Sequence, residues 1–139
     1  MSEREIQWFM RELVLAWSSL EPGAIAALHD EPFLLSSPGA ARSYASRDKL
    51  EAALTQRIAF YRKQGVAQVE LVKMNIEAPR YLRVPVFGTV QAEWRLWTTN
   101  GLPLLTFHTS QILRKTPAGW RVSATANHDE AAGFKARLG

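Results

Sequence analysis

The sequence contains no cysteine in its 139 residues. Disulfides, thiol nucleophiles and thiolate metal sites are therefore excluded from its chemistry. No apolar run approaches the roughly 20 residues that a membrane helix needs. The opening segment 2–5 lacks the basic region and apolar stretch that are typical of a signal peptide. We therefore expect a cytoplasmic protein that neither crosses nor binds a membrane.

Repeats, low-complexity tracts and long linkers are also missing. The net charge of +4 comes from scattered basic residues that form no compact cluster with aromatic residues, so we expect no nucleic-acid partner. A hydrophobic fraction of 47% with five tryptophans argues against disorder. The length suits one domain with a buried core, and we predict a single domain over residues 1–139.

Three apolar–polar runs joined by tight turns dominate the stretch 84–129. Val90–Trp97 alternates apolar and polar residues with the period of a half-buried strand. Asn100-Gly101 predicts a two-residue hairpin turn, because Asn and Gly both tolerate positive φ. Leu104–Lys115 is the second run, and Thr116–Gly119 has the composition of another turn. The pattern predicts three consecutive antiparallel strands.

The two turns together predict which side chains share a face, because paired residues lie on the same side of a sheet. Trp94 is expected opposite Phe107, and Phe107 opposite His128. The predicted inner face carries Val90, Ala92, Trp94, Leu96, Leu105, Phe107, Thr109, Gln111, Leu113, Trp120, Val122, Ala124, Ala126 and His128. The outer face carries Gln91, Glu93, Arg95, Trp97, Thr106, His108, Ser110, Ile112, Arg121, Ser123, Thr125 and Asn127.

Helical patterns fill the N-terminal half. Apolar residues recur every three or four positions over Glu3–Leu20, which predicts an amphipathic helix. Pro22 suits the first turn of a second helix that should stop before Pro32. Ser46 is the predicted N-cap of a third helix, which ends at Gly65.

The remaining segments complete a sheet. Phe33–Leu35 is expected to form a short strand that turns back towards Tyr44, and 66–76 is rich in strand-forming residues. Tyr81 should begin the strand that leads into the three consecutive runs, and the tail from Glu130 is either a last turn of helix or irregular. Helices on one side of a mostly antiparallel sheet define an α+β domain. A long twisted sheet curls, and helices across its concave side leave an apolar cavity.

Two segments carry a resemblance to a known family. Residues 25–33 (IAALHDEPF) and 113–122 (LRKTPAGWRV), together with the length and the order of elements, resemble the nuclear transport factor 2-like superfamily. This superfamily includes ketosteroid isomerase-like and SnoaL-like polyketide cyclase-like proteins with a cystatin-like fold. The resemblance implies a cone-shaped sheet with three helices on its concave face and a ligand pocket at its open end. It also implies a homodimer through the outer sheet face, and it covers both enzymes and non-enzymes.

The predicted pocket combines aromatic and polar side chains. We expect its lining to comprise Trp17, Phe33, Tyr44, Ile58, Trp94, Phe107, Thr109 and Gln111. His128 is the candidate catalytic residue, because an imidazole with an ordinary pKa can act as a base at neutral pH. The alternative is a histidine at a strand end bonded to backbone or water. The assigned inner strand positions carry no Asp or Glu, whereas family members with known chemistry use a carboxylate base.

The outer face offers a second set of polar residues. His108 lies between Glu93 and Asn127 in the predicted register, which is either a catalytic dyad or a polar row that is solvated or buried in a dimer. The candidate dimer residues are Glu93, Trp97, His108, Ile112 and Asn127. His29-Asp30-Glu31 cannot all face one way on regular backbone, so we expect no metal and no cofactor.

Three functions remain open at this point. The first is a module that binds an unknown small hydrophobic molecule. The second is a cofactor-free isomerase, lyase or cyclase that acts on a hydrophobic carbonyl compound with His128 as its general base. The third is an assembly domain that works through its outer sheet face.

Overall fold

The computed structural model describes residues 2–78 and 87–138, in which we find four helices and six strands. In chain order they are α1 (Ser2–Ser19), α2 (Pro22–Ala26), β1 (His29–Ser37), β2 (Ala40–Tyr44), α3 (Arg47–Lys63), β3 (Val66–Glu77), β4 (Phe87–Thr98), β5 (Pro103–Thr116), β6 (Gly119–Asn127) and α4 (Glu130–Leu138). The predicted strand start at Tyr81 lies outside the described residues. None of the helices in the described ranges is both long and apolar enough to span a bilayer.

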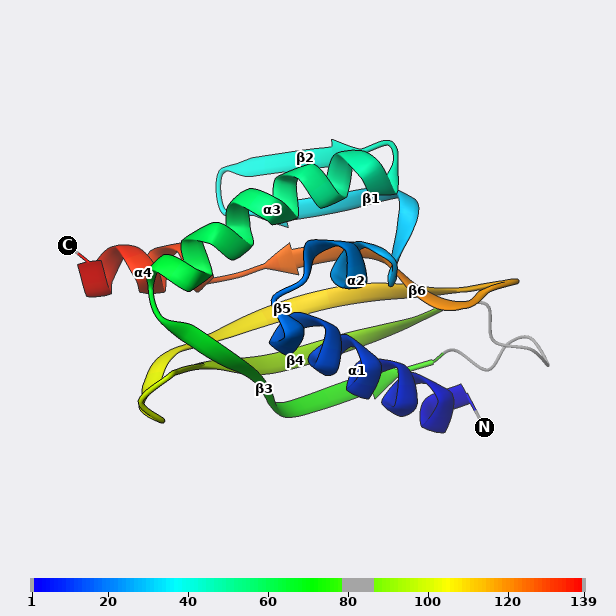
Figure 1. Cartoon of the computed structure of the whole chain (residues 1–139). Coiled ribbons are helices and arrows are strands. Elements are labelled where there is room, and N and C mark those ends of the chain that lie inside the picture. Colours follow the sequence, from blue (N-terminus) through cyan, green and yellow to red (C-terminus); the bar gives the residue numbers. More distant parts are fainter. Residues whose placement is uncertain (1, 79–86, 139) are drawn as a thin grey trace.

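The strands form one curved sheet in the order β2-β1-β6-β5-β4-β3. β1 runs parallel to β6, and all other neighbours are antiparallel. Helices α1, α2 and α3 lie along one face of this sheet, and α4 lies at the end where α3 finishes (Figure 1). The predicted α+β class and the mostly antiparallel curved sheet are confirmed.

The core lies between the helices and the concave face. Ile6, Met10 and Leu13 of α1 are fully buried because their spacing places them on one side of the helix. In α3 the buried stripe consists of Leu50, Leu54, Ile58 and Tyr61. The predicted N-cap is confirmed, since the Ser46 hydroxyl accepts a hydrogen bond from the backbone N–H of Lys49 at 3.2 Å.

The β4–β5 turn is one residue longer than predicted. The backbone N–H of Thr98 donates to the carbonyl of Leu102 at 2.9 Å, and Gly101 has a φ of 75°. The pairing irregularity that follows Leu96 compensates for the extra residue, so Trp94 still pairs with Phe107 as predicted. A three-residue loop with its glycine in the left-handed region is a common hairpin connection.

A β-bulge in β6 overturns the predicted register downstream of Val122. Leu113 pairs with Val122, both on the predicted inner face, but Ile112 pairs with Ala124, so Ser123 is an extra residue on its strand. Every side chain after the bulge changes face. Asn127 consequently pairs with Thr109 on the concave side, and the backbone of His128 bonds to His108 rather than lying opposite Phe107.

Two further boundaries differ from the prediction. The second helix stops before Pro32 as predicted, at Ala26, but β1 begins at His29 and not at Phe33. The Leu28 carbonyl accepts from the N–H of Val122 at 2.9 Å and brings the chain beside β6 at this point. The tail forms a regular helix, α4, from Glu130. Both outcomes depend on contacts between distant segments, which override weak local preferences.

Candidate functional site

A cluster of polar side chains lies on the concave face between the sheet, α3 and α4. We call it the interior polar cluster, and it consists of Arg57, Tyr61, Thr109, Gln111, Thr125, Asn127 and Glu130. Buried polar groups need hydrogen-bond partners, so the partners of each member of this cluster determine whether it is stable on an otherwise apolar face.

Glu130 is the centre of this cluster. Its side chain lies in the first turn of α4 and the residue is only 5% exposed. The carboxylate accepts hydrogen bonds from Arg57, from the Tyr61 hydroxyl and from Asn127 Nδ2, the last at 2.9 Å. Asn127 Oδ1 in turn accepts from the Glu130 backbone N–H at 3.1 Å, which caps the helix. The buried negative charge is therefore balanced by a cation and two neutral donors.

Arg57 is held in place by aromatic rings. Its guanidinium carbon lies 5.7 Å from the ring centroid of Trp17 and 5.6 Å from that of Tyr61. Phe134 of α4 packs against Tyr61 with a centroid separation of 6.3 Å. Cation–π contacts of this kind stabilise a partly desolvated arginine. The cation is thus positioned by α1 and α3 independently of its carboxylate partner.

The sheet side of the cluster combines an aromatic wall with an incompletely paired amide. Trp94 Nε1 donates to Thr109 Oγ1 at 2.8 Å, and the Trp94 and Phe107 rings stack with centroids 6.5 Å apart. Gln111 Nε2 lies 3.4 Å from Thr125 Oγ1. The buried Gln111 Oε1 and Arg57 Nε have no hydrogen-bond partner within the described ranges. The cluster therefore holds one spare acceptor, on β5, and one spare donor, on α3.

The predicted pocket residues fall into two groups. Trp17, Trp94, Phe107, Thr109 and Gln111 border or belong to the interior polar cluster, and Ile58 is buried in α3. Phe33 and Tyr44 lie elsewhere, beside His29, with ring centroids 4.7 Å (His29–Phe33) and 6.4 Å (Phe33–Tyr44) apart. The proposed lining role of all these residues remains a prediction.

The sequence reasoning missed Glu130, Arg57 and Asn127. Asn127 was expected on the outer face, and the bulge at Ser123 turns it inward. The available signal was an asparagine three residues before a glutamate, which is a capping pattern for a helix that starts at Glu130. No sequence pattern links that pair to Arg57, which lies 73 positions earlier.

The two candidate histidines lie on the outer face. His128 is exposed, and its Nε2 is 2.7 Å from Ser110 Oγ. His108 Nδ1 lies 2.7 Å from Asp129 Oδ2 and its Nε2 lies 3.2 Å from Glu93 Oε1, and these carboxylates, Asp129 first, raise the pKa of His108. Both imidazoles border a shallow hollow of about 250 Å³. The prediction that His128 shares the inner face with Trp94 is wrong, because the bulge places the two side chains on opposite sides of the sheet.

The side chains of His29, Asp30 and Glu31 diverge. His29 Nδ1–H donates to the Ile25 carbonyl at 2.8 Å, Asp30 binds Arg114 at 2.5 and 2.8 Å, and Glu31 pairs with Arg47. Each group is engaged with a different partner. Among the residues that the structure describes, no three His, Asp or Glu side chains converge in a way that could hold a metal ion.

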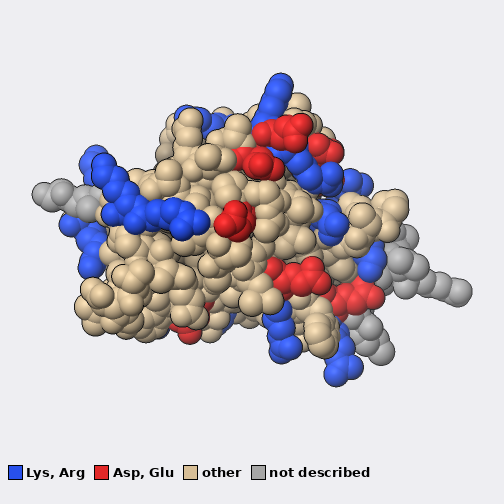
Figure 2. Space-filling view, viewed as in Figure 1, with Lys and Arg blue, Asp and Glu red and all other residues tan. Residues whose placement is uncertain are grey.

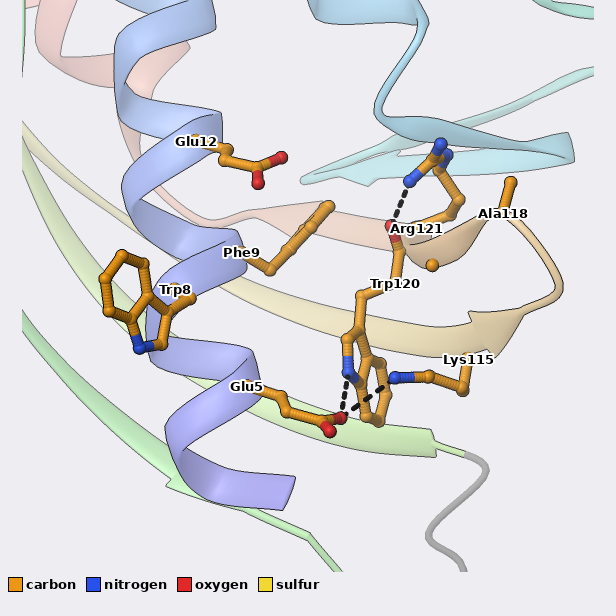
Figure 3. Close-up of a pocket in the computed structure, with 9 residues that line it drawn as sticks. Glu5, Trp8, Phe9, Glu12, Lys115, Ala118, Trp120 and Arg121 are labelled. Carbon is orange, nitrogen blue, oxygen red and sulfur yellow. Dashed lines mark hydrogen bonds and ion pairs between the residues drawn. The ribbon is translucent and has the colours of Figure 1, made fainter. Parts of the chain in front are cut away.

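An open groove of about 370 Å³ separates α1 from the β5–β6 turn (Figure 3). Glu5 accepts hydrogen bonds from Lys115 Nζ at 2.9 Å and from Trp120 Nε1 at 3.0 Å. These contacts, with Lys115 first, lower the pKa of the Glu5 carboxyl. Trp8 and Glu12 of α1 are also among the residues that line the groove (Figure 3). Glu5 therefore connects α1 to the β5–β6 hairpin across this groove.

Comparisons with known proteins agree with this architecture. A family model described as NTF2-like protein (DUF6841) matches residues 3–130. None of the curated proteins matches the sequence.

Solved structures share the fold at low sequence identity. An NTF2-like protein with a cystatin-like fold from Novosphingobium aromaticivorans is 17% identical with a TM-score of 0.72, and the match covers 98% of this chain and 86% of that one. A protein from Xanthomonas campestris, proposed to be a calcium/calmodulin dependent protein kinase II association domain, is 12% identical with a TM-score of 0.65 and coverages of 90% and 85%. A proposed dehydratase of the NTF2-like family from Streptomyces avermitilis is 11% identical with a TM-score of 0.66 and coverages of 90% and 93%. At these identities the likeness concerns the fold alone.

Proposed function

The chain belongs to the NTF2-like protein family DUF6841, and from that premise we propose that it binds a small, largely apolar molecule on the concave face of its sheet, beside the interior polar cluster. The observation that carries the proposal is Gln111 Oε1, a buried acceptor on an aromatic wall that has no partner among the described residues. A buried acceptor left unsatisfied costs about 1–3 kcal/mol, and a ligand with an N–H or O–H group would recover that free energy.

The surroundings of Gln111 have the composition of a ligand site. Trp94 and Phe107 supply two nearly parallel, buried aromatic rings, and Thr109 and Thr125 supply a small number of polar groups beside them. Ligand pockets are mostly apolar with a few placed polar groups that fix the orientation of the ligand.

The neutral fluorophore N-phenyl-1-naphthylamine is a suitable probe, because it is apolar and carries one N–H donor. We expect saturable binding to the wild-type protein, measured as an increase in probe fluorescence. Gln111→Leu keeps the side-chain volume and removes the acceptor, so it should weaken binding about fivefold or more. Gln91→Leu is the matched control on the outer face and should bind as the wild type does. Equal affinity of the wild type and Gln111→Leu would contradict the proposed site.

The alternative of an enzyme with His128 as its base receives no support from this geometry. A ligand on the concave face is separated from His128 by the sheet itself. The carboxylate on the correct side is Glu130, and it is already bonded to Arg57 and Tyr61. We therefore assign no reaction to the site.

A second candidate function is self-association through the outer face. Leu34, Ala124 and Ile112 pair in one row across three adjacent strands there, and Leu34 and Ile112 are 47% and 46% exposed. A row of this kind is self-complementary about a two-fold axis, as a dimer interface requires. The neighbour from Xanthomonas campestris is itself described as an association domain, which supports the same use of the fold.

A further inference from the structure

We propose that the ligand carries a carboxylate and that Glu130 occupies the position of this carboxylate in the unliganded protein. The inference rests on the proposed binding function of the concave face and specifies the chemical class of its ligand. The binding position, which we call the carboxylate seat, consists of Arg57, Tyr61 and Asn127.

The carboxylate seat is made of donors from α3 and β6, and its present occupant comes from a different element, α4. Arg57 and Tyr61 project from α3, Asn127 ends β6, and all three donate to the oxygens of Glu130. Arginine presents N–H groups in a planar fork that matches a carboxylate, whether this belongs to a side chain or to a free acid.

The seat remains organised when the carboxylate leaves. The contacts of Arg57 with the Trp17 and Tyr61 rings involve only α1 and α3. Without Glu130 the cation would be partly buried and unpaired, which is unfavourable. An incoming carboxylate would restore the pair and place its apolar part towards Trp94, because Asn127 lies directly opposite Thr109, the partner of the Trp94 indole.

Helix α4 is a short element whose place in the fold depends on its packing against the rest of the chain. It has only nine residues, and helices this short are marginal unless they are packed. Its packing relies on Phe134, whose ring centroid lies 5.0 Å from that of Phe60. Basic residues end both helices here, Arg62 and Lys63 in α3 and Lys135 and Arg137 in α4. Figure 2 shows Lys and Arg side chains gathered at this end of the molecule, where they would attract an anion.

Removal of the Glu130 carboxylate tests whether the carboxylate seat can bind another carboxylate. Glu130→Ala should lower the melting temperature by about 10 °C, because a buried ion pair is broken. Phenylacetate should then raise the melting temperature of Glu130→Ala by about 3 °C or more, in a saturable manner and beyond its effect on the wild type. Phenylacetamide, the uncharged analogue, should have no such effect. The double variant Arg57→Gln/Glu130→Ala should not respond to phenylacetate.

The matched control is Glu31→Ala, which breaks the exposed pair between Arg47 and Glu31. Phenylacetate should not stabilise this variant, since an exposed pair leaves no buried seat. Should Glu130→Ala fail to fold, Glu130→Gln keeps the side-chain shape, and its affinity for phenylacetate should exceed that of the wild type. The inference is overturned if phenylacetamide raises the melting temperature of Glu130→Ala as much as phenylacetate does. It is also overturned if phenylacetate still stabilises Arg57→Gln/Glu130→Ala, or if Glu130→Gln and the wild type bind phenylacetate with equal affinity.

The failure of this inference and that of the proposed function are distinguishable. Binding of N-phenyl-1-naphthylamine to Glu130→Ala without any response to phenylacetate would overturn the carboxylate class and leave the concave-face site standing. A response to phenylacetate that requires Arg57, with no binding of the neutral probe, would support the seat and contradict the wider apolar site.

Discussion

His29 is a histidine that stays neutral in the folded protein at physiological pH. It is buried at the start of β1, and desolvation by burial lowers its pKa to about 4. The unfolded chain has an ordinary histidine pKa near 6.5, so it binds a proton below that pH while the folded state does not. The contribution of His29 to the free energy of unfolding should therefore be constant above pH 6.5 and should fall as the pH drops towards 4.

As the pH falls from 7 to 5, protonation of His29 in the unfolded chain should lower the free energy of unfolding by about 2 kcal/mol. Urea unfolding at several pH values would measure this, and His29→Gln, which does not titrate, should show a flatter slope over the same range. The opposite contribution of His108 overlaps only the top of this window, because its raised pKa gives stability that is complete below pH 6.5 and is lost as the pH rises through the raised pKa. Asp30 and Glu5, whose pKa values are lowered, lose their contributions below about pH 4.5. Equal slopes for the wild type and His29→Gln would rule this account out.

Strand alternation in the sequence predicted some residues of the site and could not predict others. Trp94 and Thr109 were assigned to the concave face by alternation alone, and they do meet there. Glu130 could not be found in this way, since its carboxylate is defined by Arg57 and Tyr61 from a distant helix. His128 was placed wrongly because a single extra residue, Ser123, reverses all later positions of its strand.

At the scale of elements, local signals predicted the helices and the hairpins. The stripe of α1, the Ser46 cap of α3 and the glycine of the β4–β5 loop each depend on residues close in sequence. The short α2 and the insertion of β1 beside β6 depend on pairing across the whole chain. Periodicity carries no information about such pairing, so these features had to come from the structure.

Helix α4 offers a test at this scale, because it approaches β5 through a glycine. A side-chain carbon added at Gly133 would lie 2.5 Å from Leu105 Cδ1. Gly133→Val should therefore push α4 away from the sheet, cost about 1–3 kcal/mol of stability and speed up hydrogen exchange of the α4 amides. Ala132→Val is the control, since it adds the same β-branched side chain at an exposed position of the same helix. If both variants exchange alike, close packing at Gly133 does not hold α4 in place.

For the whole molecule, the sheet separates two surfaces with different chemistry. Its concave side carries the aromatic wall and the carboxylate seat, and its outer side carries the apolar row of Leu34, Ala124 and Ile112. The bulge at Ser123 contributes to both, since it turns Asn127 inward and Ala124 outward. Small side chains such as Ala124 allow a second sheet to approach at the usual spacing of about 10 Å.

We expect the wild-type protein to be a dimer through the outer face, and Ile112→Glu to be a monomer at the same concentration. A charge at one end of the apolar row opposes its burial on association, while Ile112 is exposed enough within one chain that folding should be unaffected. Light scattering coupled to size-exclusion chromatography would give the masses. Leu102→Glu changes an exposed leucine in the β4–β5 loop, away from the row, and should remain dimeric. A monomeric wild type, or a dimeric Ile112→Glu, would exclude this interface.

The parallel pairing of β1 with β6 has a consequence for biosynthesis. A ribosome releases β1 early, but the strand that completes its hydrogen bonds is the last one of the sheet to be made. The nascent chain must therefore carry an open strand edge through most of translation, when it can pair with other chains or with a chaperone. Slowing elongation after β2 should accordingly lengthen the period in which this protein is most prone to aggregate.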